Sequence, residues 1–124
     1  MLAVVVAGIT SVEVEALMDV VEDVIIKLER LKRRLGSQYS EQVDKWIFTF
    51  AYIREGLKSI AEKLEEGRLI SASNEACEVE RLVNMRMIGM DENDAIGSSL
   101  RGSLAAVRGV VSRLCGNKAL DSSI

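Results

Sequence analysis

Apolar side chains recur at alternating spacings of three and four residues over two long stretches of the chain. This spacing predicts helices with a heptad-type apolar seam. The first is expected over residues 10–35, from a capping-box pattern at Thr10 to Glu13 and up to Gly36. The second is expected over residues 40–66. The seam positions are Val14, Leu17, Val21, Val24, Leu28, Leu31 and Leu35, then Val43, Trp46, Phe50, Ile53, Leu57, Ile60 and Leu64.

Two further helices are expected over residues 71–89 and 92–115, with Gly89 and Gly116 as end signals. The tail, residues 116–124, carries no strong signal. Short connections favour antiparallel neighbours. We therefore predict a single all-α domain, residues 1–124, folded as an antiparallel up-down-up-down four-helix bundle.

The third helix is about a third shorter than the first two, which leaves apolar surface on the long helices uncovered. The apolar N-terminal segment, residues 1–9, is expected to pack either on the bundle or on another subunit, and it is too short to span a bilayer. The length mismatch predicts a homo-oligomer, with a dimer favoured.

Composition excludes several chemistries. The chain has no histidine, which removes imidazole metal sites and Ser-His or Cys-His catalysis. It also has no proline, in agreement with long uninterrupted seams. Its net charge of −3 disfavours general affinity for nucleic acid or anionic membranes.

The two cysteines, Cys77 and Cys115, fall on the third and fourth predicted helices. If the connection turns near residue 91, the two positions differ by about 15 Å along the helix axes. A disulfide needs Cα atoms about 4.4–6.8 Å apart. We therefore expect two reduced thiols and a cytoplasmic location.

Paired carboxylates carry one alternative function. Asp19 and Glu22 on the first helix, with Glu75 and Glu78 on the third, resemble the acidic pairs of all-α nucleotide pyrophosphohydrolases of the MazG type. The resemblance implies a Mg²⁺-dependent enzyme acting on a nucleotide. These carboxylates flank the apolar seams, so solvated outer faces are the competing interpretation. No other cofactor is expected.

Cations form two groups. The first helix ends in a basic run, Lys27, Arg30, Lys32, Arg33 and Arg34, which complements the helix dipole. Arg101 and Arg108 share a face of the fourth helix, where pairing with the acidic first or third helix, in the same or another subunit, is expected. A further alternative is therefore a small subunit associated with nucleic acid through these cations.

Exposed aromatic and small residues carry the leading hypothesis. Phe48 and Tyr52 lie outside the seam of the second helix, as a partner-docking surface or a seat for the N-terminal segment. Gly102, Ala106 and Gly109 would let another helix approach closely. We expect a non-enzymatic interaction module that self-associates through these faces, with no catalytic residues.

Overall fold

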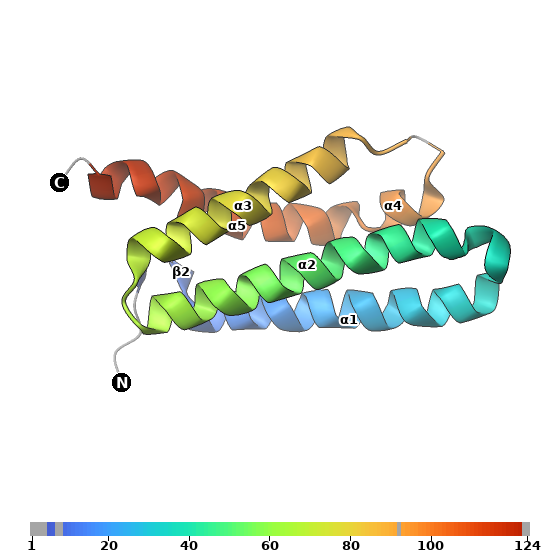
Figure 1. Cartoon of the computed structure of the whole chain (residues 1–124), viewed down its shortest axis with the longest axis horizontal. Helices are drawn as coiled ribbons and strands as arrows, with labels where there is room; N and C mark the ends of the chain where they lie inside the picture. The colour runs from blue at the N-terminus through green and yellow to red at the C-terminus, as the bar shows by residue number, and fades with distance from the viewer. Residues whose placement is uncertain (1–4, 7–8, 92, 123–124) are drawn as a thin grey trace.

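The computed structural model describes residues 5–6, 9–91 and 93–122. Two short strands and a series of helices follow one another along the chain (Figure 1). Their bounds are β1 Val5–Val6, β2 Ile9–Thr10, α1 Ser11–Leu35, the 3-10 turn η1 Ser37–Tyr39, α2 Ser40–Glu65, α3 Leu69–Ile88, α4 Ala95–Ser99 and α5 Arg101–Ser122.

Four main helices, α1, α2, α3 and α5, form an up-down bundle, which confirms the predicted fold class. Helix α1 packs chiefly on α2, and α5 packs chiefly on α3. Contacts between α2 and α3 join the two helical hairpins (Figure 1). Helices α1 and α5 contact each other far less, so one side of the bundle is loosely closed.

The core follows the heptad seams. Every predicted seam residue of α2 is fully buried, as are Leu104, Val107 and Val111 of α5. The seam of α1 is buried only as far as Leu28; Leu31 is half-buried and Leu35 is exposed. The last turn of α1 therefore extends beyond the well-packed part of the bundle.

Local signals set the helix ends. The backbone N–H of Glu13 donates to Thr10 Oγ1 at 3.2 Å, as the capping pattern predicts. Gly36 and Gly67 adopt positive φ angles of 77° and 75° at the ends of α1 and α2. A left-handed backbone costs glycine nothing, so the chain reverses there.

The fourth predicted helix, residues 92–115, is wrong in two respects. It is divided at Leu100 into the short helix α4 and the long helix α5. It also continues past Gly116 to Ser122, because one glycine costs only about 1 kcal/mol of helix propensity and does not by itself end a helix.

The N-terminal strands pair antiparallel, with Val5 opposite Thr10 and Val6 opposite Ile9. Ile9 is fully buried in the core beside α1. The rest of the predicted apolar segment, residues 1–4 and 7–8, lies outside the described residues. Residues 123–124 of the tail also lie outside them.

Cys77 and Cys115 form a disulfide, with Cα atoms 4.8 Å apart, so the prediction of two reduced thiols is wrong. Cys77 lies 11 residues before the end of α3, and Cys115 lies 14 residues after the start of α5. The predicted offset counted helical rise from residue 91, whereas the rise along α5 begins at Arg101. Counted from these helix ends, the offset is three residues, about 4.5 Å instead of about 15 Å, which is within reach of a disulfide.

Candidate functional site

The aromatic pair Phe48 and Tyr52 lies on the outer face of α2. Their exposed fractions are 73% and 54%, whereas Trp46 and Phe50 of the same helix are fully buried. The two exposed rings are four residues apart and are therefore neighbours on the helix surface. The described part of the N-terminal segment leaves both rings in solvent.

The small residues Gly102, Ala106 and Gly109 lie on the exposed side of α5. A Cβ atom added at Gly102 or Gly109 would have no heavy atom within 4 Å. Within the part of the chain that the structure describes, no other helix packs against Gly102 or Gly109. Their use by a second molecule stays a prediction.

Ion pairs are expected for two arginines of α5. Arg101 and Arg108 are exposed, and within the described residues neither forms an ion pair with a carboxylate. The described residues therefore show no pairing of these two arginines with acidic helices of the same chain. Pairing with another subunit stays a prediction.

The structure separates the predicted partner-binding residues into two surfaces. Phe48 and Tyr52 belong to α2, and the small residues and arginines belong to α5. The helices contact in the order α1, α2, α3, α5 around the bundle, so α2 and α5 are diagonal neighbours. Their outer faces point away from each other, and no single partner helix can cover both.

The four carboxylates of the enzyme alternative also lie on diagonal helices, α1 and α3. Asp19 is exposed, and Glu22 binds Arg54 Nη1 of α2 at 3.1 Å. Glu75 binds Lys63 Nζ at 3.0 Å, and Glu78 contacts Arg81 at 3.4 Å. The described side chains contain no group of three or more acidic or cysteine residues placed to hold a metal ion.

A small hollow of about 140 Å³ lies between α2 and α3. Tyr52, Glu55, Glu75 and Glu78 line it, so the structure brings one predicted docking residue beside two of the predicted metal ligands. Glu75 already has a lysine partner here. The hollow therefore extends the aromatic surface with an acidic edge.

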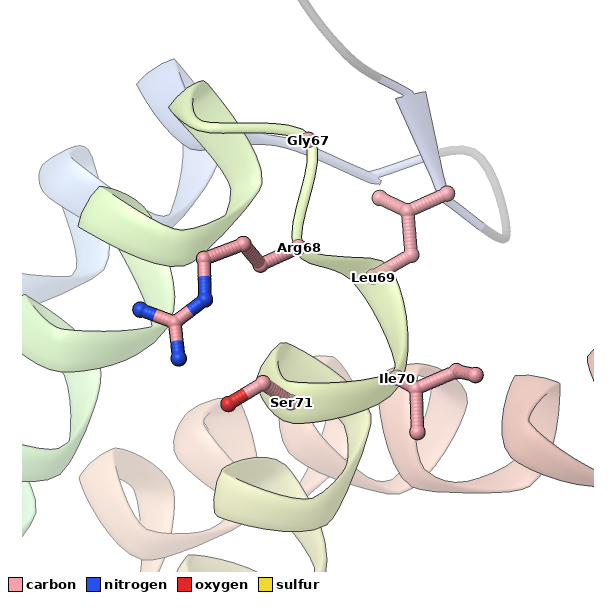
Figure 2. A pocket seen from close by; sticks show the side chains of 5 residues that line it. All are labelled: Gly67, Arg68, Leu69, Ile70 and Ser71. Atoms are coloured by element: carbon pink, nitrogen blue, oxygen red, sulfur yellow. The ribbon is translucent and has the colours of Figure 1, made fainter.

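A larger hollow of about 490 Å³ lies at the corner between α2 and α3 (Figure 2). Five consecutive residues, 67–71, line it, and Arg68 points away from Leu69 and Ile70. Side chains from other elements do not converge on it within the described residues. The corner thus provides an open surface, and its described lining residues form no cluster of reactive groups.

The basic run of α1 borders a groove beside α4 and the start of α5. Lys27 and Leu31 line two adjoining hollows, one of about 230 Å³ that reaches α4 and the start of α5, and one of about 360 Å³ whose described lining residues all belong to α1. Lys32 points to the other side, where it binds Asp44 of α2 at 2.7 Å. The run therefore divides between an internal ion pair and a solvent-facing groove.

Asp94 is a buried carboxylate that directly precedes α4. Its Oδ1 accepts from Gln42 Nε2 and from the backbone N–H of Gly97, both at 2.7 Å, and its Oδ2 accepts from Trp46 Nε1 at 3.1 Å. Asp94 thereby caps α4 and ties it to α2. A buried indole needs an acceptor, which is the signal that could have identified this contact.

Comparison with protein-family models, curated proteins and solved structures finds no significant match for this chain. None of the helices, within the described residues, is both long enough and apolar enough to cross a membrane. The function is therefore inferred from the bundle and its surfaces alone.

Proposed function

We propose that this chain is a non-enzymatic helical interaction module that self-associates as a homodimer through the outer face of α2. The observation that carries the proposal is the exposed aromatic pair Phe48 and Tyr52. Aromatic side chains are enriched at protein interfaces, where they bury a large area at a small entropic cost. In solvent, two adjacent rings on α2 would stabilise the helix by only about 0.2–0.5 kcal/mol.

The charges around this pair support a second copy as the occupant. In an antiparallel pairing of two α2 helices centred at the level of residue 50, Phe48 lies opposite Tyr52 of the other copy. The same pairing places Lys45 opposite Glu55 of the other copy, because residues 45 and 55, like residues 48 and 52, are equally distant from residue 50. Lys45 and Glu55 are exposed and flank the rings. A symmetric contact of this kind is self-complementary.

Sedimentation velocity across a concentration series tests the proposal. We expect the wild type to dimerise and Phe48→Glu to weaken dimerisation by at least about tenfold, because a buried aromatic anchor is replaced by a charge. Val12→Glu is the matched control, since Val12 is 65% exposed but lies on α1. A wild type that stays monomeric at high micromolar concentration would rule out self-association.

A charge exchange tests the antiparallel register. Lys45→Glu should weaken the dimer because two glutamates then face each other, and Lys45→Glu combined with Glu55→Lys should restore it. If the combined variant is no tighter than Lys45→Glu alone, the two α2 helices do not pair in this register.

The cysteine pair changes the expected location. Disulfides persist in oxidising compartments and also inside the cells of hyperthermophiles. We therefore propose a cytoplasmic location only if the cytoplasm of the native cell keeps the Cys77–Cys115 disulfide oxidised. Thiol labelling of the protein in native cells, with and without prior reduction, distinguishes the disulfide from two free thiols.

A further inference from the structure

A groove runs along the C-terminal half of α1, on the side where α1 and α5 are only loosely packed. Two adjoining hollows form it and share Lys27 and Leu31. We propose that this groove binds an acidic amphipathic helix of a partner protein. Its lining residues are Val24, Lys27, Leu28, Arg30, Leu31, Arg34, Ser99, Leu100 and Ser103.

The charges of the groove have one sign. Lys27, Arg30 and Arg34 line it, and no carboxylate is among the described lining residues. Lys27 Nζ lies 2.9 Å from Asp23 Oδ2 of the same helix. The lysine side chain remains largely exposed in this ion pair. Arg30 and Arg34 have no ion-pair partner within the described part of the chain. A partner with carboxylates along one edge would supply the missing counter-charges.

The floor of the groove is apolar in the hollow between α1 and the α4–α5 junction, and Leu31 continues it into the adjoining hollow. Val24, Leu28 and Leu100 belong to the buried core, and Leu31 is half-buried above them. Ser99 and Ser103 form the opposite wall, where short side chains leave room for a third helix to approach. The groove therefore offers apolar contact below a row of cations.

The dimensions suit a helix. Val24 and Arg34 are ten residues apart on α1, about 15 Å, which matches roughly three turns of a bound helix. Such a helix would place apolar anchors on the floor and glutamate or aspartate beside the cations. A phosphate backbone would satisfy the cations but would leave the apolar floor uncovered, so an acidic helix fits better than nucleic acid.

Fluorescence anisotropy with a defined probe tests the proposal. The probe is a labelled amphipathic peptide of about 15 residues built from leucine and glutamate, and the control peptide carries lysine in place of each glutamate. We expect the acidic peptide to bind and the basic peptide not to bind. Arg30→Glu combined with Arg34→Glu should weaken binding of the acidic peptide by at least about tenfold.

Arg33→Glu combined with Arg108→Glu is the matched control variant, because it changes the net charge equally and both arginines are exposed but do not line the groove. The affinity of this control variant for the acidic peptide should stay within about twofold of wild type. Equal losses in both variants would mean that the peptide responds to general charge, and absence of peptide binding would also overturn the proposal. Circular dichroism of each variant verifies that the bundle is folded.

Two other occupants are tested in the same experiment. If a short DNA duplex binds more tightly than the acidic peptide and loses affinity in the Arg30/Arg34 variant, the groove is a nucleic-acid site and the proposal is wrong. If that variant instead abolishes dimerisation, the occupant is a second copy of this chain. Repeating the peptide titration with Phe48→Glu separates this result from the α2 interface.

Discussion

Gly56 lies inside α2 at the point where α3 comes closest. A Cβ atom at this position would stand 2.5 Å from Val79 Cγ2, which no packed structure tolerates without movement. Glycine within a helix costs about 1 kcal/mol relative to alanine. Here the missing side chain lets α2 and α3 approach, so packing outweighs helix propensity at this residue.

Replacing Gly56 by alanine should lower the free energy of unfolding by about 1–3 kcal/mol, because the new methyl group overpacks the contact with Val79. Gly109→Ala is the matched control, since a Cβ atom there meets nothing within 4 Å. It should raise stability by up to about 1 kcal/mol through helix propensity alone. Urea unfolding followed by Trp46 fluorescence measures both. Stabilisation by both substitutions would show that α2 and α3 are less closely packed.

At the level of elements, α3 and α5 are joined by polar and covalent links as well as by apolar packing. Ser73 Oγ donates to the carbonyl oxygen of Leu114 at 2.9 Å, and Ser112 Oγ contacts Glu80. The Cys77–Cys115 disulfide lies between these two contacts along α3. This hairpin carries the small apolar residues Ala72 and Ala76, so the covalent link supports a comparatively thin apolar contact.

Breaking the disulfide should destabilise the bundle. The bond joins residues separated by 38 positions. Loss of that constraint on the unfolded chain corresponds to about 3–4 kcal/mol in the chain-entropy model. Urea unfolding with and without reductant measures the effect, and the Cys77→Ser/Cys115→Ser variant should match the reduced wild type. Reductant should not change the variant; a shift there would point to an effect other than reduction of this bond.

The elements show which features a sequence can predict. Heptad spacing, with the end signals at Thr10 and Gly36, predicts α1 and α2 to within one residue at each end, because core burial and helix periodicity agree there. It did not place the break at Leu100, since Asp94 caps α4 through contacts with Gln42 and Trp46 that are distant in sequence. The disulfide was missed for the same reason, because its register depends on where α5 begins. The α1 groove likewise depends on how α1 and α5 pack.

At the scale of the whole molecule, the bundle is two tight helical hairpins joined on one side and loosely closed on the other. The aromatic pair lies on α2, and the basic groove lies between α1 and the start of α5. A dimer formed through α2 would therefore keep both grooves accessible. In our proposal, the protein joins two copies of an acidic partner helix.

Filling the groove without changing its charge separates shape from electrostatics. Ser103→Leu places a larger apolar side chain on the wall opposite Leu31 while Lys27, Arg30 and Arg34 remain. Affinity for the acidic leucine–glutamate peptide should fall by at least about tenfold, because the added leucine occupies the space in which the peptide's apolar face would pack. The thermal midpoint should stay equal or rise, since the added side chain covers apolar surface. Ser98→Leu, exposed on α4 and outside the groove lining, is the control. If Ser103→Leu binds the peptide as tightly as wild type does, the peptide contacts only the cations and does not enter the groove.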